Sequence, residues 1–337
     1  MKTPHALAFA GLLLAVPAIS ADAKIIRQVE KTFAVQPGGL LKAATQGGDI
    51  EVRTADTNEV KVTARQTIHA ATDAKADELL EKLELTMEQR GNDVILDAKY
   101  EEKRFRWSMN WPPVQVDFVV TVPKSFNADL RTAASEAQGK ADAGLFKATI
   151  NLDLRTSGGD ITVGDLQGNV KAHTSGGDLK FARIGGELNG STSGGDIDLT
   201  ESAARAKLTT SGGDITIERA NGPTEVSTSG GDIRIRSVRE LISASTSGGD
   251  IHAEIDGTLT RDTVLSTSGG NVKLKLLKEF GFRLDASTSG GDIDATGLTI
   301  KLDRGGNRKS RLVGDVNGGG PTLKLRSSGG DIDVIAN

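Results

Sequence analysis

The sequence predicts an all-β chain: a β-solenoid with about 18–21 residues per coil, preceded by a small β-rich module with one short helix. The first observation is a repeated Thr-Ser-Gly-Gly-Asp phrase whose aspartates recur every 18 residues. The second is alternation, because apolar residues stand one and three positions after each aspartate, as Ile215 and Ile217 do. The third is composition, since 41 glycines and 4% aromatic residues suit a narrow interior of small aliphatic side chains. The repeated aspartates are Asp160, Asp178, Asp196, Asp214, Asp232 and Asp250.

Residues 1–23 are expected to be a secretory signal peptide. Lys2 supplies the positive start, residues 6–18 form an apolar run too short to span a bilayer, and Ala21-Asp22-Ala23 is a small-residue cleavage site. No later segment is predicted to cross a membrane, and the chain has no cysteine for a disulfide or a lipid anchor. The expected location is therefore periplasmic, secreted or at the cell surface.

Residues 24–128 do not keep the period and are expected to form the β-rich module that caps the solenoid. A helix is predicted over 73–81 with Thr72 as its N-cap, followed by a hairpin over 83–96 and a strand over 114–123. The repeat domain is assigned to 129–337, with an irregular C-terminal cap at about 300–327. A cap at each end would cover coil edges that otherwise invite aggregation.

The glycine pairs are interpreted as structural turns between strands. A tight corner is expected to need the positive φ that glycine adopts freely, so a Gly213→Val substitution should be worse than Ser211→Ala. The threonine two residues before each pair should point inward by alternation. The turn glycines are Gly158, Gly159, Gly176, Gly177, Gly194, Gly195, Gly212, Gly213, Gly230, Gly231, Gly248 and Gly249.

The aspartate column admits two interpretations. In one it binds calcium, as the glycine- and aspartate-rich nonapeptides of toxin-type β-rolls do. In the other each carboxylate caps a corner by accepting hydrogen bonds from backbone N–H groups. The nonapeptide spacing is absent, and Asn271 occupies the column without a charge, so the sequence favours the corner cap. No other metal or cofactor site is predicted.

One segment does not fit the repeat. Residues 102–113 hold both tryptophans, and Phe105, Trp107 and Trp111 form a candidate partner patch if they are exposed. The alternative is a long loop whose aromatic side chains are buried on its own domain.

Catalytic motifs are missing from the sequence. It contains no HExxH, GxSxG or phosphate-binding loop and no cysteine nucleophile, and the repeat histidines His173 and His252 occupy outward positions. The chain carries 41 basic and 45 acidic residues with no basic stripe, which argues against nucleic acid as a partner.

The repeated "TSGGDI", the apparent signal, the β-rich start and the Gly-Gly-Gly-Pro section at 318–321 resemble a bacterial family of unknown function whose members are described as "putative adhesins" with β-strand repeats. The resemblance covers most of the mature chain and implies a β-solenoid at the cell envelope, often beside envelope-stress systems. It transfers no catalytic residues.

The sequence thus predicts a non-enzymatic, exported envelope protein that serves as an adhesin or binding scaffold. Its partner is expected to be an envelope component or a cell-surface polymer. A polysaccharide-active enzyme on a β-helix and a calcium-binding structural repeat protein stay as alternatives.

Overall fold

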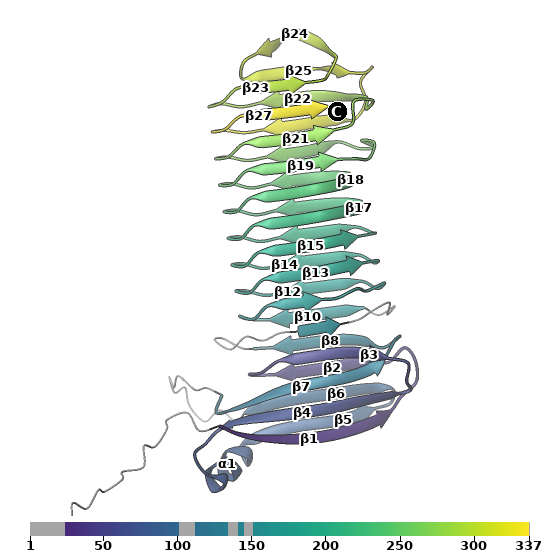
Figure 1. Ribbon diagram of the computed structural model, residues 1–337, viewed down its shortest axis with the longest axis vertical. Helices are drawn as coiled ribbons and strands as arrows, with labels where there is room; N and C mark the ends of the chain where they lie inside the picture. Colours follow the sequence, from purple (N-terminus) through teal and green to yellow (C-terminus); the bar gives the residue numbers. More distant parts are fainter. Residues whose placement is uncertain (1–23, 101–111, 134–140, 145–150, 337) are drawn as a thin grey trace, which may run out of the picture.

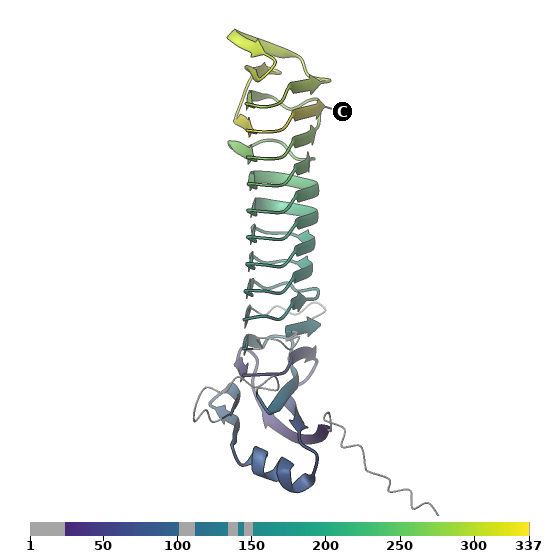
Figure 2. The ribbon, with the colours of Figure 1, turned by 90° about the vertical axis from the view of Figure 1, so that its left-hand side faces the viewer.

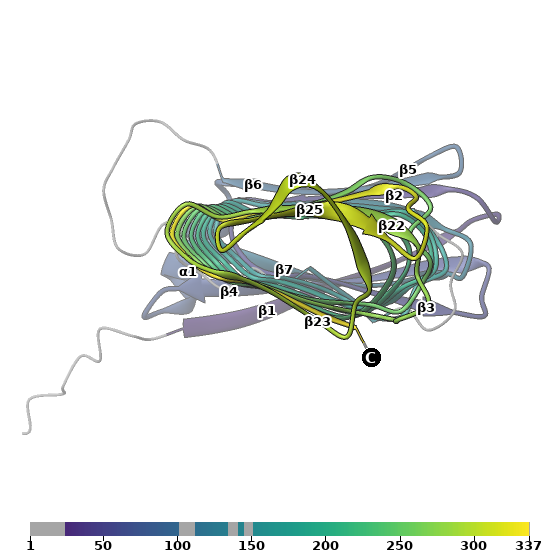
Figure 3. The ribbon, with the colours of Figure 1, turned by 90° about the horizontal axis from the view of Figure 1, so that it is seen from above.

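The computed structural model describes residues 24–100, 112–133, 141–144 and 151–336. Within these ranges the chain has 27 strands and one helix, which confirms the all-β prediction. The chain winds into rungs stacked along the long axis of a rod, and each rung places one strand in each of two facing sheets (Figures 1 and 3). The expected signal peptide, 1–23, lies outside the described residues.

Parallel pairing one repeat apart builds both sheets. Leu152 pairs with Val170 and Ile197 with Ile215, so each residue lies beside its equivalent 18 positions along the chain. The first sheet contains β2 (Leu40–Thr45), β8 (Asn127–Thr132), β10 (Leu152–Thr156), β12 (Val170–His173), β14 (Leu188–Ser191), β16 (Ala206–Thr209), β20 (Thr263–Ser266), β26 (Thr322–Arg326) and β22 (Phe282–Ser287).

The second sheet contains β3 (Ile50–Ala55), β9 (Ala141–Gly144), β11 (Ile161–Val163), β13 (Leu179–Ile184), β15 (Ile197–Ser202), β19 (Ile251–Ile255), β21 (Val272–Leu276), β27 (Ile332–Ala336) and β23 (Ile293–Thr296). Two longer strands, β17 (Ile215–Ser227) and β18 (Ile233–Ser245), run through the second sheet of one rung and the first sheet of the next.

The core lies between the sheets and is made by period-two alternation. Ile215 and Ile217 are fully buried, whereas Thr216 between them is not. The inward columns consist mostly of Ile, Leu, Val and Ala, whose modest size allows the two sheets to face each other closely (Figure 2). The inward threonines are buried as well, from Thr156 to Thr288.

The N-terminal part continues the same two sheets. β6 (Asp93–Tyr100) pairs in parallel with β2, and β7 (Val114–Pro123) pairs in parallel with β3. The stack then ends in antiparallel strands: β5 (Leu83–Arg90) beside β6, and β4 (Glu59–His69) and β1 (Lys24–Ala34) beyond β7. Helix α1 (Asp73–Leu80) starts after Thr72, whose Oγ1 accepts a hydrogen bond from the Lys75 N–H at 3.3 Å.

Rungs near both ends are stacked out of sequence order. The β2–β3 rung lies between the later β6–β7 rung and the β8–β9 rung. At the other end β26–β27 lies between β20–β21 and β22–β23. β25 (Arg311–Val316) then pairs antiparallel with β22, and β24 (Ile300–Arg308) pairs with β25 to finish the rod. The segment closest to the C-terminus is therefore an interior rung.

Candidate binding surface

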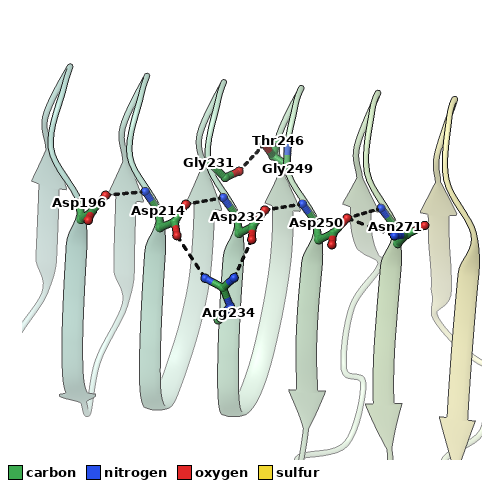
Figure 4. A network of polar contacts seen from close by, with 9 residues as sticks. All are labelled: Asp196, Asp214, Gly231, Asp232, Arg234, Thr246, Gly249, Asp250 and Asn271. Atoms are coloured by element: carbon green, nitrogen blue, oxygen red, sulfur yellow. Dashed lines mark hydrogen bonds and ion pairs between the residues drawn. The ribbon is translucent and has the colours of Figure 1, made fainter.

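A buried threonine ladder holds the corners together. Thr246 Oγ1 donates to the Gly231 carbonyl of the preceding rung at 2.8 Å and accepts from the N–H of Gly249 in its own rung at 3.3 Å (Figure 4). The same donated bond recurs from Thr174 to Thr267, at 2.8–2.9 Å. Each hydroxyl thus satisfies one buried acceptor and one buried donor, which explains why the repeat carries threonine here.

A second ladder runs through the aspartates. Oδ1 of Asp214 accepts the backbone N–H of Asp232 at 2.7 Å, and Asp232 in turn accepts that of Asp250 at 2.8 Å (Figure 4). Asn271 continues the ladder without a charge, because its Oδ1 accepts from the Asp331 N–H at 2.8 Å. These bonds offset the repulsion between carboxylates that are stacked about 4.8 Å apart.

The second oxygen of each carboxylate, Oδ2, does not take part in this ladder. Its partners therefore determine how much of the negative charge in the column stays unpaired. Arg234 donates to Oδ2 of Asp214 at 3.1 Å and of Asp232 at 2.6 Å, so it neutralises two neighbouring carboxylates. Within the described ranges, no cluster of three or more His, Asp or Glu side chains is arranged to hold a metal ion. A calcium ion on this column would compete with the backbone donors for Oδ1 and with Arg234 for Oδ2.

The ladder predicts different effects for two substitutions at Asp196, whose Oδ1 accepts from the Asp214 N–H at 2.8 Å. Asp196→Asn keeps the acceptor and removes a charge, so the free energy of unfolding should stay the same or rise. Asp196→Ala leaves the N–H without its partner and should lower the free energy of unfolding by about 1–2 kcal/mol. Urea denaturation of both variants checks this. Equal losses would show that the carboxylate, and not its acceptor role, matters.

The glycine corners need a correction. None of the repeat glycines from Gly176 to Gly249 has a positive φ, so the expected left-handed turn is wrong. The physical reason for glycine is close stacking: a Cβ on Gly213 would lie 2.2 Å from the carbonyl oxygen of Gly195 in the preceding rung. The first glycine of each pair is less crowded, since a Cβ on Gly212 would lie 3.1 Å from the Gly194 oxygen. Gly158 and Gly159 form the same corner in an earlier rung, where Gly159 accepts the Thr174 hydroxyl.

The outward face of the first sheet carries two files of hydroxyl groups. One file, which we call the strand file, is in register from strand to strand and is half-buried; it consists of Ser191, Thr209, Ser227, Ser245 and Ser266. The other, which we call the corner file, stands two residues later at the corners and is exposed; it consists of Ser193, Ser211, Ser229, Ser247 and Ser268. Together they make one flat, uncharged polar strip.

The outward face of the second sheet differs in chemistry. In the same rungs its two outward columns are largely charged, and some of the charges pair between rungs, as Arg236 does with Glu218 at 3.3 Å. Desolvation raises the pKa of the Asp198 carboxyl, and the nearby carboxylates of Asp196 and Asp178 raise it further. The first column consists of Asp198, Thr216, Arg234, His252 and Lys273, and the second of Thr200, Glu218, Arg236, Glu254 and Lys275.

A shallow groove of about 400 Å³ lies along the starts of β10, β12, β14 and β16. An asparagine ladder lines it, because Oδ1 of Asn151 accepts from the Asn169 N–H at 3.1 Å and Oδ1 of Asn169 accepts from the Glu187 N–H at 2.8 Å. Lys171, Asn189 and Lys207 form its outward wall in one column. This ladder was not predicted from the sequence, although its residues stand nine positions before successive repeat aspartates.

Two carboxylates line the groove, on strands that are two rungs apart. Asp153 is held by Arg155 through two hydrogen bonds of 3.0 and 2.8 Å. Glu187 stands two rungs away and two residues to the side, which places the two backbones about 12 Å apart by strand geometry. Acid and base pairs of glycosidases are separated by about 5–9.5 Å between their carboxyl groups.

A column of alternating charges near the ends of the second-sheet strands was also not predicted. Arg183 donates to the Asp165 carboxylate of the preceding rung, with Nε 2.9 Å from Oδ2, and this bond lowers the pKa of Asp165. Glu201 and Arg219 continue the alternation of sign in the next two rungs. The predicted patch of Phe105, Trp107 and Trp111 lies outside the described residues.

The chain matches the family described as Toastrack DUF4097 over residues 41–335. A comparison with curated proteins gives no match. Among the described residues no helix is long and apolar enough to cross a membrane.

Solved structures with likeness to this chain come from several bacteria. A "putative adhesin" from Parabacteroides distasonis is 14% identical with a TM-score of 0.44, covering 92% of this chain and 97% of that one. A "putative adhesin" from Parabacteroides merdae is 10% identical with a TM-score of 0.41, covering 92% and 96%. A "putative lipid binding protein" from Parabacteroides distasonis is 14% identical with a TM-score of 0.42, covering 91% and 96%.

Proposed function

This chain belongs to the Toastrack DUF4097 family, and on that premise we propose that it is a non-enzymatic binding scaffold exported to the cell envelope. The observation that carries the proposal is the pair of long, regular outward faces. Their side chains repeat from rung to rung instead of gathering at one point, as the in-register strand file from Ser191 to Ser266 illustrates. A repeated surface suits an extended partner better than a single small molecule.

A binding scaffold should retain envelope polymers without altering them. We expect the chain from residue 24 onward to co-sediment with at least one insoluble envelope polysaccharide while the concentration of reducing ends stays constant. Release of reducing ends that disappears in a Glu187→Gln variant would contradict the proposal.

The groove along β10–β16 favours a second candidate, a polysaccharide-active enzyme. Asp153 and Glu187 lie in one groove beside Lys171 and Lys207, and a pair of carboxylates is the catalytic unit of most glycosidases. The engagement of both Asp153 carboxylate oxygens by Arg155 weighs against it. The reducing-end assay separates the two candidates.

A further inference from the structure

The two outward faces of the rod differ, although the fold treats them alike. Stacking fixes the inward residues, because these fill the core and bond the corners, while an outward position accepts nearly any side chain. Across the same rungs the strand file of the first sheet is entirely hydroxyl-bearing, from Ser191 to Ser266. Its counterpart on the second sheet includes Asp198, Arg234 and Lys273. Packing gives no reason for this difference.

The serines of the corner file are not explained by internal bonding either. At the corner only the backbone carbonyl of the serine forms a hydrogen bond: the Ser193 carbonyl accepts from the Gly212 N–H at 3.0 Å. Any residue could supply that carbonyl. No corner-file hydroxyl makes a side-chain hydrogen bond to another described residue. In the strand file two such bonds occur: one joins Ser191 Oγ and His173 Nδ1 at 2.8 Å, and the other runs from Ser227 Oγ to Thr209 Oγ1 at 3.3 Å. Most of these hydroxyls are therefore left for solvent or a ligand.

The spacing of the hydroxyls is regular in two directions. Neighbouring rungs place equivalent hydroxyls about 4.8 Å apart along the rod, and the two files are about 6.6 Å apart across it. Other residue types bound the strip along the strand file: Arg155 and His173 precede Ser191, and Arg326 follows Ser266. The strip itself has no charge, although the outward column beside the strand file includes Lys207 and Glu225, the second of which pairs with Arg205.

We propose that this strip binds a neutral, hydroxyl-rich polysaccharide that lies along the rod. This inference rests on the proposed scaffold function and names the class of its ligand. A neutral glycan matches the strip in polarity and in its repetition of donors and acceptors. An anionic polymer would find no countercharge on it, whereas the outward columns of the second sheet include Lys273.

The geometry also dictates how affinity should depend on ligand length. Each hydroxyl contact replaces a contact with water, so one rung contributes little net binding. Several rungs engaged by one chain act together through effective concentration. Short oligosaccharides should therefore bind weakly and long chains tightly.

The test uses the chain from residue 24 onward with cellulose and an insoluble β-1,3-glucan as neutral probes and a calcium-alginate gel as the anionic probe. The first variant is Ser227→Lys with Ser266→Lys, which places two charges on the strip. The matched control is Thr200→Lys with Thr216→Lys, which places two charges on the outward face of the second sheet. Circular dichroism and the melting temperature establish that both variants are folded.

We expect the original chain to bind a neutral probe, the strip variant to bind about tenfold more weakly and the control to bind within about twofold of the original. Equal loss in both variants, no loss in either, or retention by alginate alone would overturn the inference and leave the scaffold standing. Release of reducing ends, in contrast, would overturn the proposed scaffold function itself.

Discussion

Truncation of the chain after Gly320 is expected to unfold residues 282–316 in addition to removing the residues after Gly320. Rung β26–β27 lies between β20–β21 and β22–β23, so residues 282–316 pair with the rest of the rod only through it. The truncation deletes four fully buried side chains, which together contribute about 8 kcal/mol by their burial. These are Leu323, Leu325, Ile332 and Val334.

Hydrogen exchange read by mass spectrometry checks this prediction. Amides of 282–316 should lose their protection in the truncated chain, while those of 152–255 keep theirs, since a stack of repeats unfolds locally from its end. Retained protection of 282–299 would mean that β22–β23 can pair directly with β20–β21. The order of stacking would then not depend on the C-terminal segment.

Gly213→Ala is expected to be much more damaging than Gly212→Ala, although the two glycines are adjacent. A Cβ on Gly213 meets the Gly195 carbonyl oxygen at 2.2 Å, a distance that forces the rungs apart. A Cβ on Gly212 lies 3.1 Å from the Gly194 oxygen and needs only a small adjustment. We expect a loss of about 3 kcal/mol for the first and less than about 1 kcal/mol for the second.

Urea denaturation of the two variants measures this difference directly. Both substitutions replace glycine by alanine at a backbone with negative φ, so the conformational change in the unfolded chain is the same in each. Equal losses would show that chain entropy, and not contact between rungs, explains the glycine pairs.

Much of the fold could be predicted because inward and outward positions alternate strictly. The alternation placed Ile215 and Ile217 in the core and the repeat threonines inside the corners, and both sets are buried. The helix was placed by its N-cap Thr72, where local hydrogen bonding decides the start. Such features depend on near neighbours in the sequence.

Features that depend on which rungs touch could not be predicted. The rungs are chemically alike, so the same hydrogen bond forms between any two of them. Asp331 Oδ1 accepts from the Asp292 N–H just as Asn271 Oδ1 accepts from the Asp331 N–H. The spacing of the repeats along the chain therefore does not give the order of the rungs in space. The role of the corner glycines was mistaken for the same reason. Their constraint comes from the rung below and not from their own backbone angles.

The candidate surface was only partly predictable. Outward serines follow from the alternation, but the contrast between the two sheets emerges only when residues 18 apart are read as columns, as Ser227 and Ser245 are. The asparagine ladder at Asn151 and Asn169 is hidden because single polar residues near a turn are common.

Disulfide cross-linking between outward columns tests the stacking order most directly, and the chain contains no native cysteine to confuse the result. Lys273 and Asp333 are paired across neighbouring strands, whereas Lys273 and Asp294 are separated by the Asp333 rung. Lys273→Cys with Asp333→Cys should form an intramolecular disulfide under mild oxidation, since in-register neighbours lie about 4.8 Å apart and disulfides join Cα atoms about 4.4–6.8 Å apart. Lys273→Cys with Asp294→Cys should stay reduced. The reverse result, a disulfide in the second pair and none in the first, would mean that the rungs follow one another in sequence order and would contradict the stack described above.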